Sequence, residues 1–158
     1  MPIRLTILIR KLPSISVEEF NKYWVRQPPA PYSPTKSTHA DTSRQSDAHP
    51  STFLSVPIVQ EKIIKYQQFH ASHPFSAGLK THGLPVADYD GGAEFWAETY
   101  EDMMAVFQDP EYTRIVVPDE KKFLDREKAV MMLGWEEVKW DDRKPAEGVK
   151  VELVTRQG

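Results

Sequence analysis

The chain contains no cysteine among its 158 residues, so disulfides, thiolate nucleophiles and cysteine-ligated metal sites are excluded. Basic residues form no run, which argues against a nucleic-acid partner. No stretch approaches the roughly 20 apolar residues of a membrane-spanning helix. The apolar N-terminus is interrupted by Arg4 and lacks the long apolar core of a secretory signal. We therefore expect a cytoplasmic protein with neither a membrane nor a nucleic-acid partner.

What remains is an ordinary globular composition, with 40% hydrophobic residues, 27% charged residues and a net charge of -3. This length fits one domain, which we place at residues 1–140. Residues 27–48 are rich in Pro, Ser and Thr, and we expect an inserted loop there that is either functional or disordered. Residues 141–158 form a polar tail, in which 151–154 could add an edge strand to a neighbour.

The strongest local signals lie at the start of the chain. Residues 3–10 alternate apolar and polar side chains, which predicts a strand. Ser16 and Glu19 have the spacing of a capping box, and an apolar stripe follows them, which predicts a helix that ends before Pro28.

The rest of the chain divides by the same criteria. The expected elements are a helix or turn at 51–60 interrupted by Pro57, a strand at 62–70, a long connection at 71–92, a strand at 93–100, a helix at 101–116 divided by Pro110, a turn or short helix at 118–125 and a strand at 127–138.

The resulting order is β-α-β-β-α-β, which predicts an α+β, ferredoxin-like fold with a four-stranded antiparallel sheet. Helices cover only one face of such a sheet. A second copy is the simplest cover for the other face, so we expect a homodimer that forms a dimeric α+β barrel.

Three blocks of the sequence resemble EthD-domain proteins. Residues 10–24 read RKLPSISVEEFNKYW, close to the family's basic pair followed by kPGLS.EEF..YW. The second and third blocks, residues 49–70 and 89–125, resemble a fungal branch of the family through HPSTFLSVPIVQEKIIKYQQFH and YDGGAEFWAETYEDMMAVFQDPEYTRIVVPDEKKFLD. Residues 25–48 are a departure, because the family has only a few residues between the first helix and the histidine turn.

The fungal proteins that this chain resembles act in aromatic polyketide pathways and include decarboxylases of anthrone-type acids such as atrochrysone carboxylic acid. The resemblance implies a cofactor-independent lyase of secondary metabolism that decarboxylates an aromatic acid. Related barrels include anthrone oxygenases and cyclases, so an oxygenase, cyclase or dehydratase stays open. A noncatalytic protein that binds small molecules is the alternative of a different class, because one fold hosts all these functions.

Decarboxylation builds negative charge that a hydrogen-bond donor must stabilise, and the carbon must then receive a proton. Histidine and tyrosine suit both tasks near neutral pH. His49 matches the family's histidine and either lines the pocket or bonds a backbone carbonyl in a turn. Tyr66, Gln68 and His70 share one strand face and form either an acid/base relay of Tyr66 with His70 or a polar layer in the dimer interface.

Other candidates are aromatic or acidic. Trp96 and Phe95 either stack on the ring of a ligand or belong to the core. Asp119 either orients a histidine or caps a helix. Phe53 and Trp24, together with Gln68, complete the residues that we expect to contact the substrate. No group of His, Asp and Glu has metal-ligand spacing, so we expect neither a metal nor an organic cofactor.

Overall fold

The computed structural model describes residues 1–24 and 49–152. In chain order its elements are β1 (Ile3–Ile9), α1 (Val17–Trp24), α2 (His49–Leu54), α3 (Pro57–Lys62), β2 (Ile63–His70), α4 (His73–Thr81), β3 (Gly91–Ala97), α5 (Tyr100–Gln108), the π-helical turn η2 (Tyr112–Val116), α6 (Val117–Glu120), the 3₁₀ turn η3 (Arg126–Lys128), β4 (Val130–Gly134), β5 (Trp140–Asp141) and β6 (Lys144–Pro145).

The main sheet has four strands in the order β2-β3-β1-β4, and every neighbouring pair is antiparallel. Ile7 at its centre lies opposite Ala93 of β3 and Met131 of β4. This strand order, with the two helical connections, is the ferredoxin-like arrangement. The predicted α+β fold class is confirmed.

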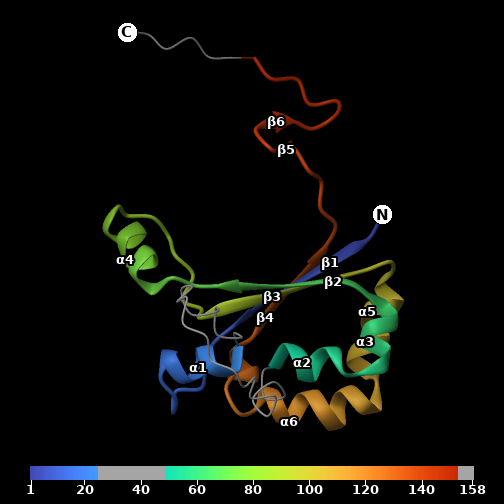
Figure 1. Ribbon diagram of the computed structural model, residues 1–158. Coiled ribbons are helices and arrows are strands. Elements are labelled where there is room, and N and C mark those ends of the chain that lie inside the picture. Colours follow the sequence, from blue (N-terminus) through green and yellow to red (C-terminus); the bar gives the residue numbers. More distant parts are fainter. Residues whose placement is uncertain (25–48, 153–158) are drawn as a thin grey trace, which may run out of the picture.

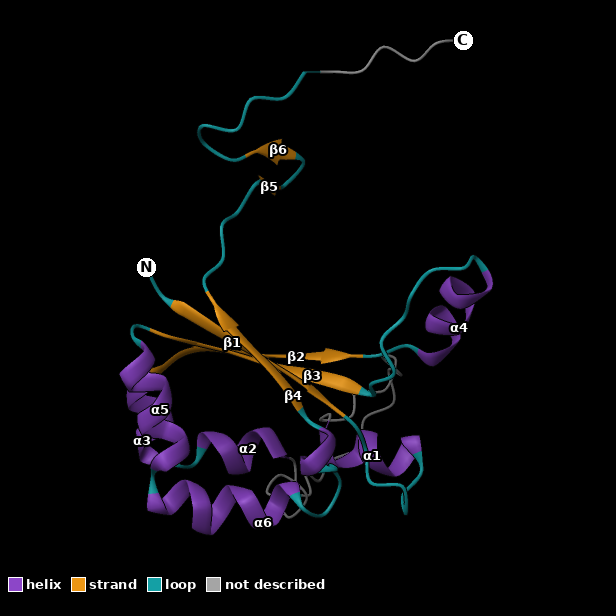
Figure 2. Cartoon of the chain, turned by 180° about the vertical axis from the view of Figure 1, so that it is seen from behind, coloured by secondary structure: helices purple, strands orange, loops and turns teal. Residues whose placement is uncertain are grey.

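The helices cover one face of the sheet (Figure 1). In both views α2 and α6 lie on one side of the sheet, and α4 and the C-terminal arm lie on the other (Figure 2). Among the residues that the structure describes, no helix has the length and apolar character needed to cross a membrane.

The first helix begins at the predicted capping box. The backbone N–H of Glu19 donates to Ser16 Oγ at 3.0 Å, and the N–H of Ser16 donates to Glu19 Oε2 at 2.8 Å. These bonds satisfy amides that the first turn of a helix leaves free. The apolar stripe buries Phe20 and Trp24 against the sheet.

The segment between the first helix and the second strand is more helical than expected. The element predicted at 51–60 is two helices, because the ring of Pro57 interrupts one helix and suits the first turn of the next. Helix α2 begins at His49, and its inner side buries His49 and Phe53.

The long connection predicted at 71–92 contains helix α4, which the sequence analysis did not predict. Pro74 lies in its first turn, where no N–H is needed, and Gly78 is tolerated in its interior. Neither Pro74 nor Gly78 therefore interrupts this helix. Figure 1 shows α4 standing apart from the other helices.

Strand β3 begins and ends earlier than the prediction of 93–100. Gly91 and Gly92 belong to the strand, and Thr99 instead caps helix α5, with its Oγ1 accepting from the N–H of Asp102 at 3.1 Å. The division of the next helix before Pro110 is confirmed, because α5 ends at Gln108.

The strand predicted at 127–138 is confined to 130–134. Beyond it, an arm carries the small hairpin of β5 and β6. The predicted insertion at 27–48 lies outside the described residues, as do residues 153 and 154 of the predicted edge strand at 151–154.

The Trp24 indole packs on the backbone of β3 at Gly91. A Cβ on Gly91 would lie 2.9 Å from the carbonyl oxygen of Phe69 and 3.1 Å from Trp24 Nε1. Only glycine allows this approach of α1 to the sheet.

We expect Gly91→Ala to lower the free energy of unfolding by about 1–3 kcal/mol, because the indole or strand β2 must shift. Gly78→Ala is the matched control, since a Cβ there meets nothing within 4 Å. It should stabilise the protein by up to about 1 kcal/mol through helix propensity. Urea unfolding of both variants measures the difference, and equal stabilities would contradict the close packing at Gly91.

Candidate functional site

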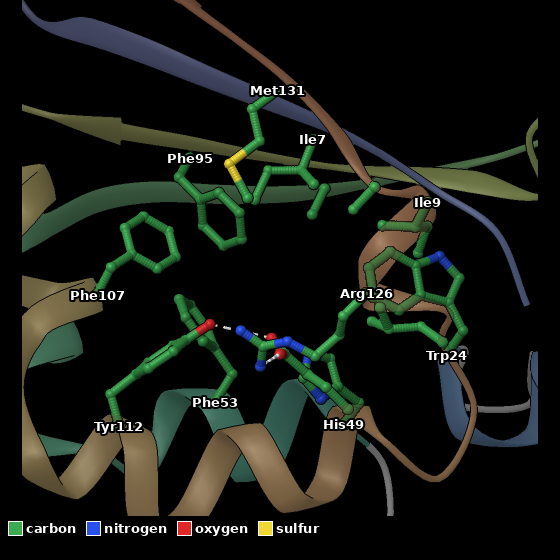
Figure 3. Close-up of a pocket in the computed structure, with 14 residues that line it drawn as sticks. Ile7, Ile9, Trp24, His49, Phe53, Phe95, Phe107, Tyr112, Arg126 and Met131 are labelled. Carbon is green, nitrogen blue, oxygen red and sulfur yellow. Dashed lines mark hydrogen bonds and ion pairs between the residues drawn. The ribbon is translucent and has the colours of Figure 1, made fainter. Parts of the chain in front are cut away.

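A pocket of about 100 Å³ lies between the sheet and the helix layer. Figure 3 shows side chains from the sheet above it and from the helices below it pointing into the same space. Its lining is mostly apolar and aromatic and consists of Ile7, Ile9, Trp24, His49, Phe53, Ala93, Phe95, Phe107, Tyr112, Glu120, Leu124, Arg126, Ala129 and Met131. Such a lining, with a few polar groups, is typical of small-molecule sites.

His49 brings a titratable side chain to this wall although only 5% of it is exposed. Its ring stacks on Trp24, with centroids 5.7 Å apart, and meets Phe123 edge-on at 5.1 Å. His49 Nδ1 lies 3.0 Å from Asp119 Oδ2. His49 thus lies in the wall of the pocket, with Asp119 next to it, and their expected roles stay predictions.

Asp119 is buried on α6 and uses both carboxylate oxygens. Lys122 Nζ donates to Oδ1 at 3.2 Å, while Oδ2 faces His49. Burial alone would raise the pKa of Asp119, but the bonds from His49 and Lys122 outweigh it and lower the pKa below its usual value. The carboxylate therefore stays ionised and holds the imidazole with Nδ1 as the donor.

This tautomer leaves Nε2 of neutral His49 as a hydrogen-bond acceptor. Nε2 makes no hydrogen bond to the residues described in the structure. The ring lines the pocket, so Nε2 is the atom that can exchange a proton with a bound molecule.

A second polar group lies in the pocket, and the sequence analysis missed it. The hydroxyl of Tyr112 donates to Glu120 Oε1 at 3.0 Å, and Arg126 Nη1 forms an ion pair with Glu120 Oε2. The dashed lines in Figure 3 mark these bonds. The sequence pointed to Asp119 and not to the adjacent Glu120, because no local pattern separates a buried carboxyl from an exposed one.

Burial raises the pKa of Glu120, and Arg126 opposes that effect without cancelling it. Burial likewise raises the pKa of Tyr112, so this phenol stays protonated and remains a donor. The pKa values of the two neighbouring carboxyls of α6, Asp119 and Glu120, are therefore shifted in opposite directions.

Tyr66 and Gln68 lie on the helix side of β2. Tyr66 is parallel to Phe95, with ring centroids 5.0 Å apart, and contacts Phe53 at 5.0 Å. Gln68 Nε2 donates to the Tyr66 hydroxyl at 2.9 Å. Tyr66 thus packs against Phe53 and Phe95, which line the pocket. It lies on the helix side of β2, which is not the sheet face that we expected at a dimer interface.

His70 is separated from this pocket by Trp24, whose ring it meets edge-on at 6.5 Å. It lines a second cavity, of about 530 Å³, between α4 and the sheet. Partial burial lowers the pKa of His70. The hydroxyl of Tyr66 pairs with Gln68, so the described contacts do not bring Tyr66 and His70 together as a relay.

Phe95 and Trp96 cannot stack on one ligand, because consecutive strand residues face opposite sides. Phe95 lines the pocket, whereas Trp96 lies on the outer sheet face. There its Nε1 donates to Glu136 Oε1 at 2.9 Å, and Lys65 Nζ lies 4.2 Å from the ring centre. The predicted contact of Trp96 with a ligand in the His49 pocket is corrected.

The arrangement can therefore hold an aromatic ring between apolar walls and exchange protons with it at two places. Within residues 1–24 and 49–152, no group of three His, Asp or Glu side chains is placed to hold a metal ion.

We expect Asp119→Asn to destabilise the fold by about 1–3 kcal/mol near neutral pH, because His49 and Lys122 lose their ionised partner. The folded pKa of Asp119 lies below its unfolded value, so its contribution exists above the unfolded pKa and is lost as pH falls through the folded pKa. The deficit should shrink when urea unfolding is repeated near about pH 3. Asp88→Asn, at an exposed pair with Arg10, is the control. A deficit that does not change with pH would contradict this electrostatic role.

The chain is similar to several known proteins. The decarboxylase claH of Passalora fulva is 29% identical over 106 residues, which cover 61% of this chain and 69% of that protein. A crystal structure of an EthD family protein from Bacillus halodurans has a TM-score of 0.49 at 12% identity, covering 87% of this chain and 100% of that one.

A dimeric ferredoxin-like protein of unknown function from Thermobifida fusca has a TM-score of 0.48 at 11% identity, covering 85% of this chain and 90% of that one. The family model described as the EthD domain matches residues 12–127, which is more than half of the sequence. The chain belongs to the EthD domain family.

Proposed function

We propose that this protein is a cofactor-independent decarboxylase of an aromatic, anthrone-type carboxylic acid from polyketide biosynthesis. The observation that carries the proposal is the buried His49–Asp119 pair, with His49 Nδ1 3.0 Å from Asp119 Oδ2, in the wall of an aromatic pocket. A relative of this chain is named a decarboxylase, which supports the same reaction class.

The chemistry follows from the orientation of His49. When the carboxyl group leaves as carbon dioxide, the electrons of the broken carbon–carbon bond delocalise toward an oxygen attached to the ring, which becomes enolate-like. Protonated His49 can donate from Nε2 to that oxygen, and Asp119 stabilises the positive imidazolium on the other side. The apolar walls exclude water and strengthen this interaction.

The size of the pocket limits it to at most one ring of such a substrate. Its volume of about 100 Å³ is somewhat below the roughly 150 Å³ of an engineered cavity that binds benzene. The pocket is bounded by Ala129 and Met131, and Met131 is 61% exposed. The further rings of a polycyclic acid would extend past these residues toward solvent.

Incubation of the purified protein with an anthrone-type carboxylic acid should release carbon dioxide. His49→Ala should lower the rate by about 10²–10⁴-fold, the usual contribution of a positioned acid or base. His82→Ala removes an exposed histidine at the end of α4 and should leave the rate unchanged.

The products distinguish this proposal from the alternatives. No carbon dioxide from this or related aromatic acids would refute the decarboxylase. A dehydrated, cyclised or oxygenated product would indicate one of the other reactions. Full activity of His49→Ala would refute the assignment of the site.

We also propose that two copies pair through the outer face of the sheet. Of the described helices only α4 lies on this side of the sheet, and the face carries the exposed apolar side chains of Phe69, Val130 and Met132. Its main charges are already paired within one chain, since Arg4 bonds both Glu94 and Glu136. A second sheet face of the same kind would cover the apolar side chains in an isologous dimer.

Light scattering should give twice the chain mass of 18.2 kDa. Met132→Glu places a charge on this face and should shift the protein toward monomer, because an unpaired charge is costly to bury. Leu54→Glu, at the exposed end of α2 in the helix layer, is the matched control and should remain dimeric. A monomeric wild-type protein would contradict the pairing.

A further inference from the structure

The ion pair of Glu120 with Arg126 has no role in the chemistry of His49 described above. Only 14% of the Glu120 side chain is exposed, and each of its carboxylate oxygens has one partner. Tyr112 donates to Oε1 at 3.0 Å, and Arg126 Nη1 bonds Oε2. The pair lies in a pocket whose other lining residues, apart from His49, are apolar or aromatic.

Arg126 is only partly used by this contact. Its side chain is 41% exposed, and its guanidinium contacts no other acidic side chain among the described residues. Figure 3 shows Arg126 between Tyr112 on one side and Trp24 on the other. A guanidinium has five donors in a planar fork, so the free ones can bind a second carboxylate in a bidentate manner.

Fold stability is a weak reason for such a pair. Removing two charges from water costs about as much as their attraction returns. The same region contains the exposed pair of Arg114 and Glu111, which is an ordinary contact within one helical turn. Arg126 and Glu120 differ from that pair because they line the pocket.

A second carboxylate at Arg126 would create two negative charges beside one positive charge in an apolar space, which favours protonation of one of them. The groups that face Glu120 are Arg126 from η3, Tyr112 from η2 and His49 from α2, with Asp119 beside it. Tyr66 of β2 also lies close enough to interact with the charge of Glu120. Burial is the largest influence and raises the pKa of Glu120, so this carboxyl takes up a proton most easily.

We propose that Arg126 binds the carboxylate of an aromatic acid in this pocket and that Glu120 takes up one proton as the acid binds. The identity of the acid rests on the proposed function, whereas the binding step does not require turnover. The pocket then carries one negative charge at a time, and Arg126 is its constant counter-charge.

The same proton completes the reaction without a cofactor. The bond between the ring carbon and the carboxyl carbon breaks, carbon dioxide leaves, and the electron pair stays on the ring carbon. Protonated Glu120 gives its proton to that carbon and becomes a carboxylate again. The net change converts the bound carboxylate and Glu120-COOH into carbon dioxide, the protonated ring and ionised Glu120, which pairs with Arg126.

The test uses salicylate, a single-ring hydroxy acid, and salicylamide as its uncharged analogue. Calorimetric titration in buffers with different ionisation enthalpies counts the protons taken up. We expect about one proton per salicylate and none per salicylamide, and salicylate affinity should fall by up to about tenfold per pH unit where Glu120 is ionised in the free protein.

Two variants separate the roles. Glu120→Gln should still bind salicylate but with almost no proton uptake, since the amide cannot titrate. Arg126→Gln should weaken salicylate by about tenfold or more, and salicylamide by much less, because the charged contact is lost. Arg114→Gln is the matched control at an exposed glutamate pair outside the pocket and should leave both affinities unchanged.

Absence of salicylate binding at millimolar concentration, binding without proton uptake, or uptake that persists in Glu120→Gln would each overturn the proposal. An equal loss of both ligands in Arg126→Gln would do so too. Proton-linked binding without carbon dioxide release from any aromatic acid would support this site and refute the decarboxylase. Carbon dioxide release that Arg126→Gln leaves undiminished would refute this site alone.

Discussion

The packing of the Trp24 indole on the bare backbone of Gly91 sets the distance between helix α1 and the sheet. Trp24 also stacks on His49, and His49 begins α2, so the same indole positions the pocket wall. A larger side chain in place of Gly91 would push α1 away from the sheet and disturb that wall. The geometry of the site therefore depends on a close approach that only glycine permits.

The ionisable side chains buried under the sheet are tolerated because each of them has a partner. Burying an unpaired imidazole or carboxylate would cost several kcal/mol. His49 pairs with Asp119, and Glu120 pairs with Tyr112 and Arg126. All of these partners come from α2 and the stretch 112–126. The packing of that stretch against α2 therefore determines whether these polar side chains find partners when they are buried. The π-helical turn at Tyr112–Val116 lies within that stretch, and such turns are frequent at functional sites.

Local patterns in the sequence predicted the strands and the capped helix α1, because those signals act over a few residues. The resemblance to EthD-domain proteins pointed to His49, and Asp119 was considered as a residue that could orient a histidine. The two lie 70 positions apart and meet only in the folded chain. Helix α4 was missed because Pro74 and Gly78 look like breakers when their position in the turn is unknown. Glu120 and Arg126 were missed because nothing local distinguishes a buried ion pair from an exposed one such as Glu111 with Arg114.

The two carboxyls of α6 show why position in the fold matters more than residue type. Asp119 is held ionised by His49 and Lys122, and its pKa is lowered. Glu120, the next residue, points into the apolar pocket, and burial raises its pKa. Groups whose environments separate their pKa values are suited to opposite tasks in acid–base chemistry. Asp119 stays ionised near neutral pH and can orient His49, whereas Glu120 can hold a proton and release it, so a single turn of helix can supply both an orienting anion and an acid.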